Sequence, residues 1–88
     1  MKNERICVTP TAPANFRVYG TRKTVHGLAV VEVHSGLYLS PDLRHEAVLS
    51  ESGRGWVIRG TEDRLTGDYA RDKRQALLVL AAYIAATA

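Results

Sequence analysis

The stretch "HGLAVVEVHSGLYLSPD", residues 26–42, carries the strongest β-strand pattern in this sequence. Its valines are β-branched and favour an extended chain: Val30, Val31 and Val33. Ser35-Gly36 suits a tight turn of two residues between strands. Residues 37–39 then form the returning strand, which Ser40-Pro41 ends. The pattern predicts a β-hairpin in the middle of the chain.

Shorter β patterns lie on both sides of this hairpin. They are "FRVYG" (16–20), "AVLSE" (47–51), "WVIRG" (56–60) and "RLTGDYA" (64–70), with "TRKT" (21–24) expected as a basic loop. Successive hairpins predict an antiparallel meander. The expected fold class is α+β: an antiparallel β-meander of four to five strands with one C-terminal helix packed on one face.

Two regions are expected in the chain. Residues 1–15 form an irregular basic N-terminal arm, because "TPTAPAN" (9–15) interrupts any regular pattern. The alternative for this arm is that "RICV" (5–8) adds an edge strand. Residues 16–88 form a single α+β domain.

The segment "RDKRQALLVLAAYIAATA" (71–88) predicts the helix. Asp72 and Gln75 have the spacing of a capping box at its start. At 100° per residue, one face gathers Leu77, Leu80 and Ile84, flanked by Ala76, Tyr83 and Thr87, and this face should pack on the sheet. The opposite side has no charge and carries Leu78, Ala82, Ala85 and Ala86, with Val79 and Ala81 at its margins, and the predicted contact strip is Leu78, Val79, Ala82, Ala85 and Ala86. This strip is either a contact surface or plain alanine helix exposed to water.

The composition indicates the cellular compartment in which the protein is expected. The chain has 88 residues and a net charge of +3, with +4 in residues 1–25, −2 in 26–50 and +1 in 51–88. Its single cysteine excludes an internal disulfide and fits a reducing cytoplasm. The longest apolar run, residues 76–86, is too short to span a bilayer, and no signal peptide precedes it. We therefore expect a cytoplasmic protein with no membrane partner.

Catalytic and metal-binding patterns are weak. His26, His34 and His45 are separated by eight and eleven residues, which matches no metal-ligand spacing. The serines lie beside turn residues, and none has the surroundings of a nucleophile elbow. We expect no enzymatic activity, no cofactor, no metal and no small-molecule substrate.

Residues 55–85, "GWVIRGTEDRLTGDYARDKRQALLVLAAYIA", place a tryptophan strand, a turn, a second strand and a capped helix in sequence. This third of the chain resembles small phage-encoded β-β-α modules such as the arm-type DNA-binding domains of phage integrases. In that family the sheet enters the major groove of DNA. The resemblance implies that Arg59 and Arg64 occupy DNA-contact positions.

Two functions remain as hypotheses. The first is a small non-enzymatic interaction protein of phage origin, which forms a homodimer or binds another protein through the uncharged helix strip. The alternative is a nucleic-acid-binding accessory protein. Its phosphate contacts would come from the sheet and the N-terminal region: Arg17, Arg22, Lys23, Arg59 and Arg64.

Overall fold

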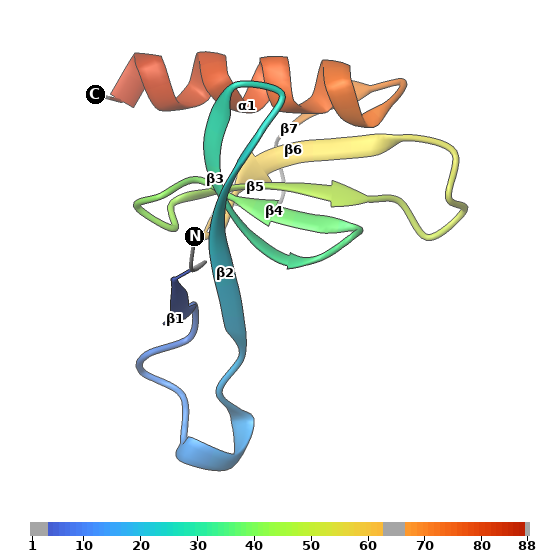
Figure 1. Ribbon diagram of the computed structural model, residues 1–88. Coiled ribbons are helices and arrows are strands. Elements are labelled where there is room, and N and C mark those ends of the chain that lie inside the picture. The colour runs from blue at the N-terminus through green and yellow to red at the C-terminus, as the bar shows by residue number, and fades with distance from the viewer. Residues whose placement is uncertain (1–3, 63–66, 88) are drawn as a thin grey trace.

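The computed structural model describes residues 4–62 and 67–87, which form one antiparallel sheet and one α-helix (Figure 1). The sheet has seven strands in the order β1-β2-β3-β4-β5-β6-β7, so each strand pairs with its neighbours in the chain. The elements are β1 (Arg5–Cys7), the 3₁₀ helix η1 (Ala14–Phe16), β2 (Tyr19–Val25), β3 (Leu28–His34), β4 (Leu37–Leu39), β5 (His45–Leu49), β6 (Trp56–Gly60), β7 (Gly67–Ala70) and α1 (Lys73–Thr87).

The central hairpin is confirmed. β3 and β4 pair antiparallel around Ser35-Gly36, and their register shifts between Glu32 and His34. The turn before them, between β2 and β3, places His26 and Gly27 at φ values of 49° and 79°. Positive φ at both central residues matches the right-handed twist of a two-residue hairpin.

The predicted number of strands was too low. The stretch 21–24, expected as a basic loop, lies inside β2. That strand pairs with β1 at the edge of the sheet, as the alternative of an edge strand at residues 5–8 proposed, so this part of the chain is not irregular throughout. The charged side chains of β2 have carboxylate partners nearby in the fold. Arg22 contacts Glu4, and Lys23 contacts Glu32. These partners are nine or eighteen residues away, so the local pattern gave no sign of them.

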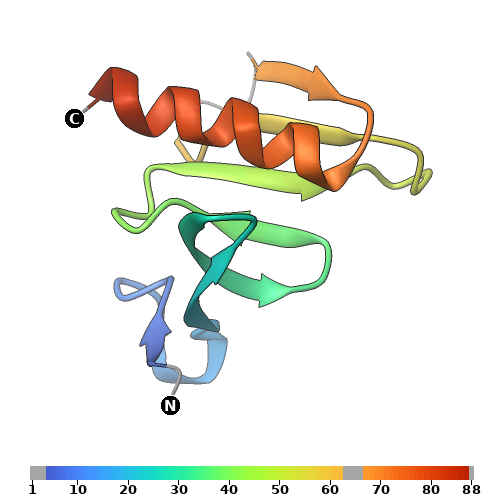
Figure 2. The same cartoon turned by 45° about the horizontal axis from the view of Figure 1, so that its top comes forward.

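The core lies between the sheet and α1, which covers β5, β6 and β7 (Figure 2). It contains Val30, Tyr38, Ala47, Trp56, Ile58 and Ala70 from the sheet, with Ala76, Leu77 and Leu80 from the helix. Ile84 and Tyr83 are partly buried against this cluster. The predicted sheet-facing side of the helix is confirmed for these residues.

A polar network closes the core beside β3. The hydroxyl of the fully buried Tyr38 donates to Glu32 Oε2 at 2.6 Å, and Lys23 Nζ donates to Glu32 Oε1 at 2.7 Å. Lys73 Nζ lies 4.8 Å from the centre of the Tyr38 ring. The hydrogen bonds from Lys23 and then Tyr38 hold the pKa of Glu32 below its ordinary value. A charged carboxylate is therefore the stable form at this partly buried site.

The N-terminal part of the sheet extends away from α1 as an arm (Figure 1). From here on the arm means residues 4–19, which extend past the predicted boundary at residue 15 and comprise β1, η1 and the start of β2. β2 leaves it at Gly20, where a Cβ atom would lie 2.6 Å from Val31 Cγ1. This close approach leaves room for glycine alone without movement of a neighbouring side chain.

Candidate functional site

The helix begins where the sequence places it. Asp72 Oδ1 accepts a hydrogen bond from the backbone N–H of Gln75 at 2.9 Å. Satisfying this N–H stabilises the first turn, and the negative charge also suits the positive end of the helix dipole. The cap sets the start of the helix, and packing of Leu77, Leu80 and Ile84 against the core sets the side that faces the sheet.

The uncharged helix strip comprises Leu78, Val79, Ala82, Ala85 and Ala86. Leu78 is 67% exposed, and the three alanines are also exposed. Val79 differs from the expectation of a free surface, because it is partly buried and packs against the core. The strip therefore projects one large apolar side chain, surrounded by small ones.

The two flanks of the helix face different parts of the sheet. On one flank the Tyr83 hydroxyl donates to the carboxylate of Asp68 on β7. On the other flank Leu78 borders a depression of about 230 Å³ beside the β2–β3 turn. Its remaining lining residues are His26, Gly27, Leu28, Arg74, Leu77 and Ala81. Leu78 thus stands between the open back of α1 and this hollow.

The five basic residues proposed to bind phosphate do not form one patch. Lys23 pairs with Glu32 on the helix side of the sheet, whereas Arg59 pairs with Glu46 on the opposite face at 2.8 Å. Arg22 pairs with Glu4. Arg17 lies on the arm, and Arg64 lies outside the described residues. Three of the five cations are thus already opposed by carboxylates.

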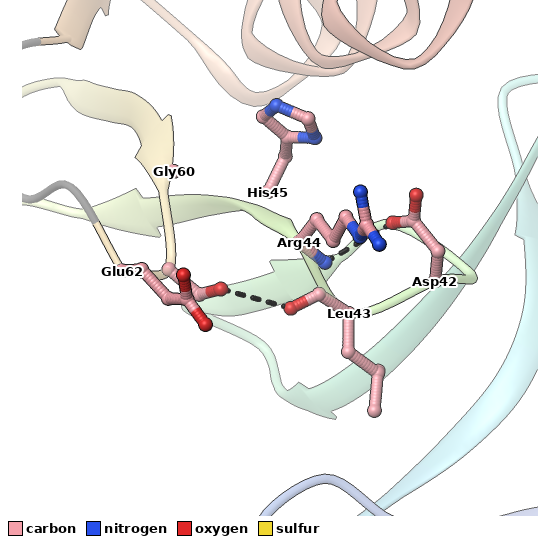
Figure 3. A pocket seen from close by; sticks show the side chains of 7 residues that line it. Asp42, Leu43, Arg44, His45, Gly60 and Glu62 are labelled. Atoms are coloured by element: carbon pink, nitrogen blue, oxygen red, sulfur yellow. Dashed lines mark hydrogen bonds between the residues drawn. The ribbon is translucent and has the colours of Figure 1, made fainter. Parts of the chain in front are cut away.

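A second hollow lies where the start of β5 meets the end of β6 (Figure 3). It is an open depression of about 660 Å³ lined by Asp42, Leu43, Arg44, His45, Gly60, Thr61 and Glu62. The β5–β6 register, which places His45 opposite Gly60, brings these two loop regions together. Sequence reasoning did not find this hollow because that register depends on pairing across the sheet.

The polar groups of this hollow mainly hold its own loops. Asp42 Oδ1 accepts from Ser40 Oγ at 2.6 Å and from the Arg44 backbone N–H at 3.0 Å, and these bonds lower the pKa of Asp42. The Thr61 hydroxyl donates to the Leu43 carbonyl at 2.9 Å. These contacts stabilise a turn in which Leu43 has a φ of 65°. They assemble no nucleophile with a base.

His45 points from this region toward α1 (Figure 3). Its ring lies 5.4 Å from the ring of Tyr83, measured between centroids, and its buried Nδ1 has no hydrogen-bond partner among the described residues. The role of His45 here is packing beneath the helix. Within residues 4–62 and 67–87, no three His, Cys, Asp or Glu residues gather closely enough to hold a metal ion.

Comparison of the chain with protein-family models, curated proteins and solved structures found no match. Among the described residues, α1 falls short of the length and apolar character that a membrane-spanning helix needs. Function is therefore inferred from the surfaces of this chain alone.

Proposed function

We propose that this protein is a small non-enzymatic interaction protein that self-associates through the back of α1. The observation that carries the proposal is the exposure of Leu78, at 67%, on a helix with no charged residue from Ala76 onward. A helix that faced only water on this side would gain solubility from lysine or glutamate there. The free thiol of Cys7 suits a reducing cytoplasm as the place of action.

A second copy of the chain is the partner that this surface suits best. The strip is uncharged, so two copies can meet without placing like charges opposite each other. Its alanines allow two helix axes to approach to about 8 Å, near the lower end of helix packing distances. Leu78 of each copy then packs against the alanines of the other. Removal of this leucine from water supplies the driving force.

The size of the helix predicts a weak dimer. A helix of 15 residues is about 22 Å long and, with its side chains, about 10 Å wide. One face of it is smaller than the roughly 800 Å² per partner of a stable interface. We therefore expect a reversible dimer that dissociates on dilution.

The test is solution mass by light scattering after size exclusion, over a range of concentrations. The variant Leu78→Glu places a charge in the centre of the proposed contact and should give a folded monomer. Two matched controls should remain dimeric: Leu78→Met, which keeps the apolar side chain, and Tyr69→Glu, which places the same charge at a residue of β7 that is 78% exposed.

Two results would refute the proposal. One is a wild-type monomer at every concentration, which would show that the strip is alanine helix exposed to water. The other is a Leu78→Glu protein with the same mass as wild type, which would place the association elsewhere on the surface.

A further inference from the structure

The arm carries a dense group of exposed apolar side chains. Phe16 is 69% exposed, Val18 42% and Tyr19 44%. These three, within four consecutive residues, account for half of the six large hydrophobic residues that are exposed in the described part of the chain. Val18 lines a hollow with Leu37 and Leu39 on the sheet face away from the helix, so it does not share a surface with Tyr19. Phe16 and Tyr19 are the two exposed aromatic rings that the arm offers to a partner.

Arginines are interleaved with these aromatic rings. Arg17 is exposed between Phe16 and Val18, and its Nε donates to the Ala12 carbonyl at 3.1 Å. Arg5 places its Cζ 4.7 Å from the centre of the Tyr19 ring. Neither arginine has a carboxylate partner among the residues described, in contrast to Arg22 and Lys23.

Hydrogen bonds hold this part of the arm in place. The Val8 N–H donates to the Val18 carbonyl at 2.9 Å, and the Val18 N–H donates to Thr9 Oγ1 at 2.8 Å. β1 then places Cys7 opposite Tyr19 in the ladder with β2. The rings are thus presented on an ordered backbone, so binding would cost little further ordering of the chain.

We propose that the arm binds single-stranded nucleic acid, with bases stacked on Phe16 and Tyr19 and phosphates near Arg5 and Arg17. Aromatic rings stack on bases of any sequence, and arginine adds cation–π and phosphate contacts. A duplex hides its base faces, so the single strand is the form that exposed rings select. A lipid surface fits less well, because insertion of Phe16 and Val18 would also carry the Arg17 guanidinium into the bilayer.

This site is separate from α1, so it goes beyond the proposed self-association. Four basic groups lie in the described residues 4–25 (Arg5, Arg17, Arg22 and Lys23), and Glu4 and Glu32 oppose two of them, which leaves a local balance of +2. This excess favours a polyanion. With two free arginines, the logarithm of affinity should fall with the logarithm of salt concentration at a slope of about −1.4.

The experiment is fluorescence anisotropy with a labelled single-stranded oligothymidylate, with the matching duplex and anionic phosphatidylglycerol vesicles as competitors. Tyr19→Ala should weaken binding of the oligonucleotide roughly 5- to 140-fold, which corresponds to loss of one stacked base. Tyr19→Phe keeps the ring and should bind like wild type. Tyr69→Ala, at an exposed tyrosine on the far edge of the sheet, is the matched control and should change nothing.

Arg17→Gln should also weaken binding and make the salt dependence shallower, whereas Arg54→Gln in the exposed β5–β6 loop should do neither. Circular dichroism and Trp56 fluorescence establish that each variant is folded. Absence of binding by the wild type at low salt overturns the proposal. An equal loss of affinity in Tyr69→Ala and Tyr19→Ala also overturns it. Preference for the duplex or for vesicles over the single strand overturns it too, and none of these results bears on the helix dimer.

Discussion

Two leucines of α1, two residues apart, should differ sharply in their effect on stability. Leu80 is fully buried between the helix and the sheet, whereas Leu78 is 67% exposed. Leu80→Ala should lower the free energy of unfolding by about 2–5 kcal/mol, since it removes buried methyl groups and leaves a cavity. Leu78→Ala removes a side chain that is only about one third buried. At about 1.5–3 kcal/mol for full burial, its loss is at most about 1 kcal/mol, and the higher helix propensity of alanine offsets part of it.

Urea unfolding followed by the fluorescence of Trp56 measures both values, because Trp56 is 6% exposed in the same core. Domains of 88 residues have free energies of unfolding of roughly 4–13 kcal/mol. Leu80→Ala should therefore unfold at a much lower urea concentration, or already be partly unfolded in water. The measurement is made at low protein concentration, so that self-association does not stabilise either protein. Equal losses for the two variants would mean that α1 does not face the sheet as described.

Two further predictions concern single polar contacts. Because its contacts with Lys23 and Tyr38 hold the pKa of Glu32 below its ordinary value of 4.5, this carboxylate stabilises the fold above that pH and loses its contribution as the pH falls through the lowered pKa. Urea unfolding at each pH gives the difference in free energy of unfolding between wild type and Glu32→Gln. This difference should shrink below pH 4.5, and a constant difference would contradict this reasoning. Asp72→Ala should lower the free energy of unfolding by about 1 kcal/mol, because it removes the hydrogen bond that caps the helix at Gln75. Asp72→Asn keeps an oxygen that can accept this bond, so it should retain most of the stability. Thermal melting compares the two variants, and equal losses of stability would count against the cap.

Local signals were sufficient for much of the fold. β6 has the bounds that its alternating pattern predicted, and the turn at Ser35-Gly36 lies between β3 and β4 as expected. The start of α1 followed from Asp72, whose carboxylate needs only a partner three residues away. Each of these features depends on neighbours in sequence, so a single sequence contains the information.

Features that depend on distant partners were missed. β2 contains Arg22 and Lys23, whose carboxylate partners are Glu4, directly before β1, and Glu32 on β3. The burial of Val79 likewise depends on how α1 rolls across the sheet. Helical spacing alone placed this residue at the margin of the strip.

Of the two candidate surfaces, the helix strip was easier to predict from the sequence than the arm, because only the arm depends on tertiary contacts. The sequence identified the helix strip, because 100° spacing separates its two sides. The basic residues of the arm were also noted, but Phe16 and Tyr19 were not, since aromatic residues are usually buried and their exposure here follows from the tertiary structure. The contact between Arg5 and Tyr19 arises from the β1–β2 ladder.

The sequential order of the sheet has a consequence for synthesis of the protein. Because every strand pairs with its predecessor, each hairpin can form within microseconds of leaving the ribosome, without waiting for distant chain. The helix, however, follows all three strands that it covers. Until α1 emerges, Ala47, Trp56 and Ile58 lie on an uncovered sheet face, which is the kind of surface that nascent chains aggregate through and chaperones bind. Emergence and docking of residues 73–87 are therefore the steps that cover this sheet face and close the domain.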